Sequence, residues 1–401
     1  MDRLIRLRRD IHMHPELARQ ELRTTSVVSA ALAEVGLAGR VLSSGTGLMV
    51  DIGAKSGPLI ALRADMDALP IQDNKEVPYR SQVPSVCHAC GHDVHTAILV
   101  GAAIELARSD LADFGRVRCI FQPAEEASVS GSLDMIAAGA LDGVDRIFSL
   151  HCDPSAQVGT VGTRVGPITS ATDHMVVKVK SLGDHSGRPH LTPNPIVAIC
   201  TVVTPLPDMV NAQLSEHERI LIGFGTISSN GTMNAIPSYA EASGTVRIPD
   251  AAVWPRVPDL IETAIANIIE SFALDCDIDY VRVCPAAVND PEATGVIDQA
   301  AASIVGREHV YTPPQSFGGA DFSWCLQDVP GAIFRLGVHP PNSTTLVDLQ
   351  SGRFDVDERA IAVGVKMFTR IAINAARAVS SDSARAVSSV DKAEYGPSEY
   401  D

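Results

Sequence analysis

The chain has 401 residues, of which 45% are hydrophobic, and a formal net charge of −16 at pH 7. A chain of this length and composition can bury a large core and favours two or more domains. The negative charge argues against nucleic acid and anionic membrane as main partners, because both are bound through basic patches. The longest apolar stretches, such as residues 97–107, are too short to span a bilayer.

The compartment is predicted from two further features. The N-terminus is basic, but no apolar core and cleavage site follow it, so it does not resemble a signal peptide. The 8 cysteines are spread along the chain without the dense pattern of a disulfide framework. This pattern indicates free thiols in a reducing compartment, and we therefore expect a cytoplasmic protein.

The first part of the chain alternates predicted helices and strands. Residues 1–36 have apolar residues at helical spacing around a break at His14 and Pro15. Short apolar runs predict strands, and runs of helix formers without proline predict helices. The strands are 48–52, 59–62, 117–121 and 146–150, and the helices are 93–107 and 133–138. Several strands end in polar residues, where α/β sheets place their sites.

The pattern changes at about residue 169. Alternating apolar residues over 175–179 predict a half-exposed antiparallel strand. A strand-helix-strand-strand-helix-strand insert of ferredoxin-like plan follows, with helices 196–203 and 257–272 and strands 220–226 and 240–248. We expect a discontinuous first domain (1–168 and 285–376, closing with helix 359–376) and an inserted second domain (169–284). Residues 377–401 are Ser-rich, contain a duplicated ARAVSS string and predict a disordered tail.

Residues 88–93 read HACGHD, which places a thiol two residues before an imidazole and a carboxylate directly after it. A soft sulfur beside an imidazole suits a first-row transition ion, and Asp93 is placed to orient His92. Cys87 and Cys90 also have the spacing of a redox pair or of half a zinc knuckle. No second pair of this kind occurs in the sequence and no thioredoxin-like context surrounds this one, so the motif favours metal binding.

Three further polar groups follow predicted strands, namely Asp65 with Asp67, the pair Glu125-Glu126, and His151. Taken alone, the glutamate pair is typical of a solvated loop, and His151 is typical of a buried histidine with satisfied hydrogen bonds. Their coincidence with the Cys-His motif at strand ends favours a functional site. In a pair of adjacent carboxylates, one can bind a metal while its neighbour acts as a base.

Four segments, in order along the chain, resemble the amidohydrolase branch of the dinuclear metallo-aminoacylase and carboxypeptidase family, which includes hippurate and auxin-conjugate hydrolases. They are RADMDALP at 63–70, HACGHD at 88–93, QPAEE at 122–126 and HSGRPH at 185–190. The resemblance extends from about Arg8 to about Ala376. It implies a two-domain α/β enzyme, with a zinc-peptidase-like α/β catalytic domain and an inserted ferredoxin-like α+β lid that commonly forms a homodimer.

The resemblance further implies that two divalent ions, most often manganese or zinc, hydrolyse the amide bond of an N-acyl amino acid or a small peptide-like amide. The implied metal ligands are Cys90, which is also a candidate bridge between the ions, and His92, Glu126 and His151. Glu125 is the implied general base. This chemistry is physically consistent, because two cations can lower the pKa of a shared water and polarise the amide carbonyl while Glu125 takes the water proton.

Three residues of the predicted lid match family positions. The resemblance implies that His185 reaches a neighbouring subunit's site and stabilises the developing oxyanion. The alternative is a histidine on a surface loop. Asn234 and Arg247 are implied to lie near the substrate carboxylate, for which a guanidinium is well suited. The substrate is a small molecule, but nothing in the sequence distinguishes benzoyl, indolyl, acetyl or peptidyl acyl groups.

Two positions depart from the family pattern. Gln350 stands where the family has a metal-binding histidine, and Ala320 stands where the family commonly has glutamate. A neutral amide oxygen is a poor substitute for imidazole at a transition ion, so the second metal should bind weakly or not at all. His339 is a candidate replacement, although its place between Val338 and Pro340 favours a solvent-exposed loop.

These departures leave three explanations, namely a natural enzyme with one tight metal, a relative that has lost hydrolysis, or changes introduced into the natural sequence. The leading hypothesis is a metal-dependent amidohydrolase. The alternative is a catalytically impaired family member that acts as a ligand-binding or regulatory protein. Retention of Glu125 favours the enzyme, whereas Gln350 and Ala320 favour the binding protein.

Overall fold

The computed structural model describes residues 1–109 and 115–394, with side chains described up to residue 381. The chain forms two compact units. Unit 1 comprises Met1–Gly166, Asn289–Pro313 and Trp324–Asp401, and unit 2 comprises Pro167–Val288 and Pro314–Ser323. Each unit has its own hydrophobic core. Among the described residues, no helix has the length and hydropathy that a membrane span requires.

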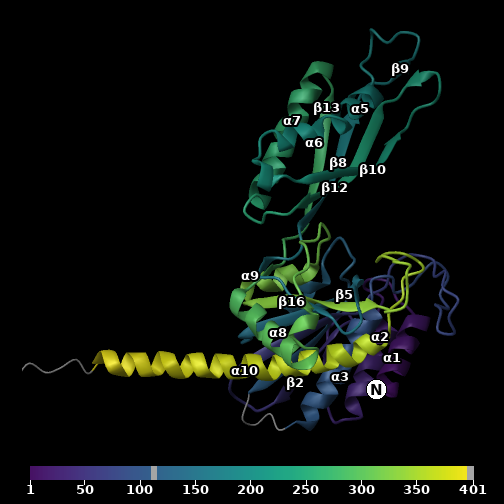
Figure 1. Ribbon diagram of the computed structural model, residues 1–401. Coiled ribbons are helices and arrows are strands. Elements are labelled where there is room, and N and C mark those ends of the chain that lie inside the picture. Colours follow the sequence, from purple (N-terminus) through teal and green to yellow (C-terminus); the bar gives the residue numbers. More distant parts are fainter. Residues whose placement is uncertain (110–114, 395–401) are drawn as a thin grey trace, which may run out of the picture. The chain divides into compact units, whose positions relative to one another are not determined.

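Unit 1 is built around a mixed sheet in which eight strands are described (Figure 1). Four central strands run parallel, in the spatial order β4 (Arg116–Gln122), β3 (Leu59–Asp65), β5 (Arg146–Gln157) and β16 (Gly331–His339). The flanking strands are β1 (Arg40–Val41) and β2 (Leu48–Gly53) on one side and β6 (Val161–Gly162) and β15 (Val310–Tyr311) on the other. Every residue of β3 is buried, as expected for a central parallel strand that is covered on both faces.

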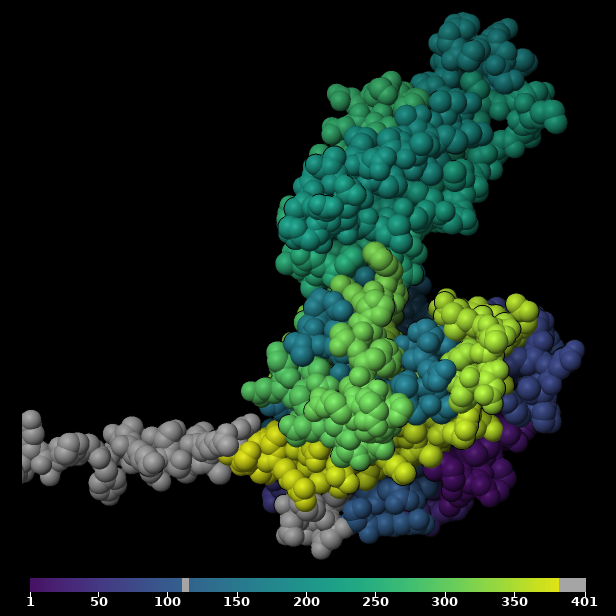
Figure 2. All heavy atoms as spheres, in the orientation of Figure 1, coloured from purple at the N-terminus to yellow at the C-terminus, as the bar shows by residue number. Residues whose placement is uncertain are grey.

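The helix α3 (His92–Arg108) begins at the predicted site and is deeply buried. Every side chain from His92 to Ile104 is buried, because α3 packs against β3, α1 (Asp2–Met13) and α10 (Arg359–Glu394). Such all-round burial explains why the segment is apolar on every face. The other helices of unit 1 are α2 (Leu22–Ala33), α4 (Gly131–Ala137), α8 (Pro291–Ile304) and α9 (Cys325–Asp328). In Figure 2, α8 and the described part of α10 lie side by side.

The C-terminal helix is longer than the sequence predicted. The expected closing helix ended at residue 376, and a disordered tail was expected from residue 377. The structure instead continues α10 to Glu394. The reason is local, because the duplicated ARAVSS strings contain good helix formers and no proline or glycine occurs between residues 365 and 395. The remainder of the predicted tail, residues 395–401, lies outside the described residues.

Unit 2 has the predicted ferredoxin-like plan. Its antiparallel sheet has the order β10 (Leu221–Ser229), β12 (Tyr239–Ile248), β8 (Ala171–Lys180) and β13 (Asp275–Cys284). Three helices, α5 (Pro195–Val203), α6 (Leu206–Asn211) and α7 (Val257–Ile269), pack with this sheet. The alternating residues Met175, Val177 and Val179 of β8 all enter the core of the unit, which confirms the period-2 interpretation.

Unit 2 also contains a short segment, 314–323, that the sequence placed in the first domain. The side chain of Gln315 donates hydrogen bonds to the carbonyl oxygens of Thr169 and Pro249, at 3.1 and 2.7 Å. The backbone N–H of Ser316 donates to the carbonyl of Ile168 at 3.0 Å. These contacts connect positions more than 60 residues apart, so a local sequence pattern does not predict them.

Candidate metal centre

The HACGHD motif lies where a loop enters α3. Gly91 directly precedes the helix and has a φ of 89°, in the left-handed region. A side chain here would place its Cβ 2.9 Å from the sulfur of Cys152, so both the backbone conformation and the close approach require glycine. This turn brings donor atoms of Cys90 and His92 within 4.8 Å of each other.

Several potential metal ligands converge on His92. Within the described residues, three groups of donor atoms lie within 4.8 Å of one another, and all three include this histidine. The groups are Cys90 with His92 and His151, His92 with Glu125 and Glu126, and Asp65 with His92 and His95. The sulfur of Cys90 is 3.4 Å from Nε2 of His151. The structure thus places together the four retained ligands implied by the resemblance and the implied base.

Hydrogen bonds leave one nitrogen of His92 open. Its Nδ1 lies 3.0 Å from the backbone oxygen of Asp67 and 3.3 Å from Oδ1 of the same residue, which assigns the proton to Nδ1. Its Nε2 is buried and has no hydrogen-bond partner. Oδ2 of Asp67 accepts the backbone N–H of Glu126 at 2.9 Å. Asp67 therefore orients the His92 ring and holds the Glu126 backbone at the same time.

The expectation that Asp93 orients His92 is wrong. Oδ2 of Asp93 contacts Nε of Arg8 at 2.6 Å and Nδ1 of His12 at 2.7 Å. The reason is helical geometry, because successive side chains of a helix point to different faces and Asp93 faces α1. Asp67, which is 25 residues away from His92 in sequence, takes the role instead.

His95 was not singled out from the sequence. It lies three residues after His92 and therefore on the same side of α3, which is the signal that could have found it. Its Nδ1 is 2.6 Å from Oδ1 of Asp65, and its Nε2 accepts the backbone N–H of Cys152 at 3.0 Å. With both ring nitrogens engaged, His95 supports the site rather than offering a free metal ligand. The other oxygen of Asp65 accepts from Arg63 at 2.6 Å.

The surroundings of the Cys90 thiol disfavour its thiolate form unless a cation is bound nearby. Burial, together with the charge of Glu126, raises the pKa of the Cys90 thiol to about 12. Burial also raises the pKa of Glu126. Burial and then the nearby Arg335 hold the pKa of His151 well below its ordinary value, so this imidazole is neutral and can act as a ligand. A bound metal cation deprotonates a coordinating thiol and stabilises the anionic form.

The donor set fits a divalent transition ion. Two buried atoms, Nε2 of His92 and Oε1 of Glu126, have no hydrogen-bond partner, although buried polar atoms are nearly always satisfied. Burial opposes a charge on His92, but Asp65 and Asp67 outweigh it and raise its pKa well above the ordinary value. The same negative field would favour a dication. Sulfur, imidazole and carboxylate together are ligands that such ions accept.

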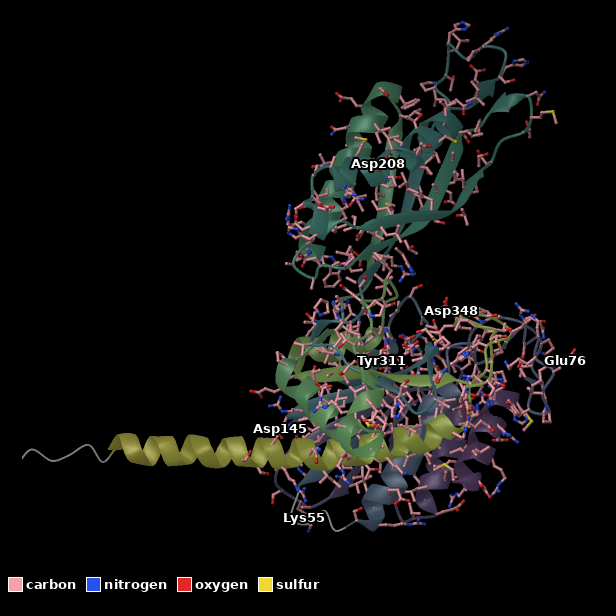
Figure 3. All side chains as sticks on the ribbon, in the orientation of Figure 1. Lys55, Glu76, Asp145, Asp208, Tyr311 and Asp348 are labelled. Atoms are coloured by element: carbon pink, nitrogen blue, oxygen red, sulfur yellow. The ribbon has the colours of Figure 1, made fainter. Side chains whose placement is uncertain are left out.

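Gln350 lies beside the motif through its backbone. Its N–H donates to the carbonyl of Ala89 at 2.8 Å, and its φ of 59° is unusual for a residue other than glycine. Its side chain is exposed. Asp348, two residues earlier, is labelled in Figure 3 and locates this segment in unit 1. His339 ends β16, is half-buried and places Nε2 3.0 Å from the carbonyl oxygen of Ser343, and it belongs to none of the three donor groups above.

The predicted lid residues are described within unit 2 alone. His185 and Asn234 lie together, because β9 (Asp184–His185) pairs with β11 (Ala235–Ile236) and the N–H of Ser186 donates to the carbonyl of Asn234 at 3.2 Å. Both side chains are exposed. Arg247 lies on β12 and donates to the hydroxyl of Thr172 at 2.7 Å. Ala320 is buried.

With this geometry established, comparisons with known proteins identify the family. Residues 61–374 match the model described as peptidase family M20/M25/M40. The chain belongs to this family. It is 31% identical, with a TM-score of 0.80, to a dinuclear metal-binding peptidase of the M20 family from Bacillus subtilis, over 94% of this chain and 98% of that one. The predicted resemblance and fold class are confirmed, and this M20-family chain is a hydrolase of the amidohydrolase and peptidase type that uses a divalent metal.

Two curated relatives add detail. The M20-family chain is 35% identical to an N-acetyl-L-cysteine deacetylase from Bacillus subtilis, over 89% of this chain and 84% of that protein. It is 42% identical to a putative glutamate–cysteine ligase from Rhodococcus jostii over 91% of its own length. It spans only 46% of that relative, so about half of the relative has no counterpart in this chain.

Proposed function

We propose that this M20-family chain hydrolyses the amide bond of an N-acyl amino acid or a small peptide-like amide with the help of bound divalent metal. The observation that carries the proposal is the convergence on His92 of a Cys90–His151 contact and of the pair Glu125-Glu126. The first supplies soft and imidazole donors, and the second supplies a ligand next to a base. No other arrangement among the described residues combines these groups.

Each residue of the centre has a separate role in the proposal. Cys90, His92, Glu126 and His151 hold the metal, which when bound lowers the pKa of a water and polarises the substrate carbonyl. Glu125 takes a proton from the attacking water and returns it to the leaving nitrogen. The roles of Glu125 and Glu126 differ although they are neighbours, since Oε1 of Glu126 is the buried atom without a partner.

The metal is manganese or zinc in this proposal, because the donor set contains thiolate, imidazole and carboxylate. One ion binds tightly. The second binds weakly, since Gln350 stands at the position where the resemblance implies a histidine. The alternative of a ligand-binding or regulatory protein without turnover rests on Gln350, whose side chain is exposed, and on Ala320, which is buried.

The names of two relatives support an order in which to test substrates. One is named for deacetylation of N-acetyl-L-cysteine, and the other is named for joining glutamate to cysteine. Both names concern an amide whose amino component is cysteine. We therefore rank N-acetyl-L-cysteine first in a panel that also contains N-benzoylglycine and an indole-acetyl amino acid.

The lid residues belong to an assembled site in this proposal. His185, Asn234 and Arg247 contribute to oxyanion and carboxylate binding in a homodimer formed through unit 2. The exposed pair His185 and Asn234 supports this view, because these polar side chains are available to a second copy. Mixed dimers of inactive Glu125→Gln and His185→Ala chains should regain partial activity, and hybrids that form without activity would remove the role in trans.

The 8 cysteines, all free, support a reducing compartment such as the cytoplasm.

The decisive experiment is Glu125→Gln, measured as hydrolysis of the panel and as metal content. The amide cannot take a proton, so we expect kcat to fall by about 10²- to 10⁴-fold while metal binding is retained. Glu76→Gln is the matched control, because Glu76 is an exposed glutamate of the same unit (Figure 3) and should change nothing. Full hydrolysis by Glu125→Gln would remove the proposed base. Tight ligand binding without turnover in the unaltered chain would favour the alternative.

A further inference from the structure

Glu21 is a buried carboxylate that does not serve its own helix. It occupies the N-cap position of α2, yet its side chain forms no capping hydrogen bond. The carboxylate of Glu16 takes that role and accepts the backbone N–H groups of Arg23 at 2.9 Å and Thr24 at 2.7 Å. Oε1 of Glu21 instead accepts the backbone N–H of Ala124 at 2.7 Å. This contact joins positions 103 residues apart.

Ala124 has an unusual backbone conformation at a critical position. Its φ is 54°, in the left-handed region that residues other than glycine seldom adopt. It directly precedes Glu125 and Glu126, the pair that reaches the metal centre. Its carbonyl accepts the N–H of Gly131 at 2.9 Å, so both polar groups of its backbone are fixed. A strained residue persists only where the surrounding structure holds it.

The stability of the fold does not explain Glu21. The residue is fully buried, and its second oxygen, Oε2, has no hydrogen-bond partner. Burial raises the pKa of this carboxyl group to about 7, and the charge of Asp67 acts in the same direction. A buried acid with an unsatisfied oxygen is costly, and an apolar residue would fill the space without that cost. The backbone amides of Glu21 itself and of Arg19 also act on this carboxylate, and its hydrogen bond to a distant part of the chain is the one with Ala124.

We propose that Glu21 is a positioning residue that holds Ala124 in the left-handed conformation and thereby directs Glu125 and Glu126 into the metal centre. This inference rests on the roles proposed above for the two glutamates. The physical reason is geometric, because a change of φ at Ala124 rotates the backbone that follows it and so moves the side chains of Glu125 and Glu126. Small displacements of a metal ligand or a base are felt strongly in affinity and rate.

The test compares Glu21→Leu with Glu21→Gln. Leucine removes the acceptor, so metal affinity, measured by competition with a chromophoric chelator, should fall about 10- to 100-fold, as for other residues that orient metal ligands. kcat should fall with it while KM changes little. Glutamine keeps an oxygen that can accept from Ala124 and should restore both quantities to within about threefold. Glu16→Gln is the matched control at the same helix start, and it should affect stability but neither metal affinity nor kcat.

A second substitution separates positioning from general damage. Glycine adopts a φ of 54° without strain, so Ala124→Gly in the Glu21→Leu background should recover much of the lost metal affinity and rate. If Glu21→Leu does not fold, Glu21→Asp replaces it, because aspartate keeps the acid but is one methylene too short to reach Ala124. Unchanged metal affinity and kcat in Glu21→Leu or Glu21→Asp would overturn the inference. It would also be overturned if metal affinity and kcat fell in Glu21→Leu and were restored neither in Glu21→Gln nor by adding Ala124→Gly.

The two proposals fail in distinguishable ways. If Glu125→Gln retains full activity, the proposed function fails whatever Glu21 does. If Glu125→Gln is inactive and the Glu21 variants are fully active with normal metal affinity, only the inference about Glu21 fails.

Discussion

The first turn of α3 lies between two buried clusters. In one cluster the carboxylate is paired with an arginine, and in the other it is not. On the side of α1, Asp93 pairs with the guanidinium of Arg8 at 2.6 Å, and Arg8 also reaches Asp355 at 2.9 Å. On the side of the metal centre, Glu126 forms no ion pair with a lysine or arginine among the described residues. Burial works against both acids, yet Arg8 and His12 hold the pKa of Asp93 well below its usual range, whereas the pKa of Glu126 is raised.

The difference shows how to separate a structural charge from a functional one. A buried acid whose cation is supplied by the chain itself forms part of the fold. A buried acid without a lysine or arginine partner, beside a thiol and a histidine whose Nε2 has no hydrogen-bond partner, is placed to receive a cation from solution. The two clusters share a single helical turn, so proximity to the motif does not by itself assign a function to a residue.

The largest predicted effects test this separation directly. Arg8→Met removes the guanidinium that pairs with Asp93 and leaves this buried charge with His12 alone, so we expect up to about 3–5 kcal/mol lower stability of the metal-free protein. His92→Ala removes a proposed metal ligand, and we expect metal affinity to fall by more than about 100-fold, beyond the 10- to 100-fold typical of residues that orient ligands. Denaturant unfolding and chelator competition measure the two quantities on both variants.

Arg9→Met is the control for the first variant, because Arg9 pairs with Glu358 but is 41% exposed. Its loss should cost at most about 1 kcal/mol, as for other surface pairs. The comparison breaks down if Arg8→Met leaves stability intact and lowers metal affinity as strongly as His92→Ala does.

A smaller effect is expected from pH and Glu21. The pKa of Glu21 is raised from its ordinary 4.5 to about 7 in the folded chain. Because the pKa is higher in the folded chain, the protonated carboxyl of Glu21 favours the folded state. This contribution to stability is fully present below about pH 4.5 and is lost as the pH rises through about 7. The difference in unfolding free energy between Glu21→Gln and the unaltered metal-free chain should therefore shift in favour of the variant by about 2–3 kcal/mol between pH 4.5 and pH 8. A difference that does not change with pH would mean that folding leaves the pKa of Glu21 unchanged.

Sequence patterns were sufficient for features that depend on local periodicity or on chemically distinctive residues. The helix from residue 93, the alternation over 175–179 and the ligand motif all express short-range rules. They failed where a partner is distant in sequence, as for Asp67 with His92 or Glu21 with Ala124. They also failed at Asp93, since the composition of the motif does not tell which helical face each side chain occupies.

The smallest predicted effect concerns Gln350, which stands where the resemblance implies a metal-binding histidine. Its backbone N–H donates to the carbonyl of Ala89, next to the proposed ligand Cys90, and its φ of 59° lies in the left-handed region. The backbone of residue 350 is therefore tied to the loop that carries Cys90, and the substitution changes the side chain alone. Gln350→His should strengthen binding of a second ion by about tenfold or more, which corresponds to about 1.4 kcal/mol, since imidazole is a far better ligand than a neutral amide. Titration with zinc or manganese, followed by elemental analysis, measures the change. If the stoichiometry of Gln350→His equals that of the unaltered chain at every metal concentration, then residue 350 does not limit the binding of a second ion.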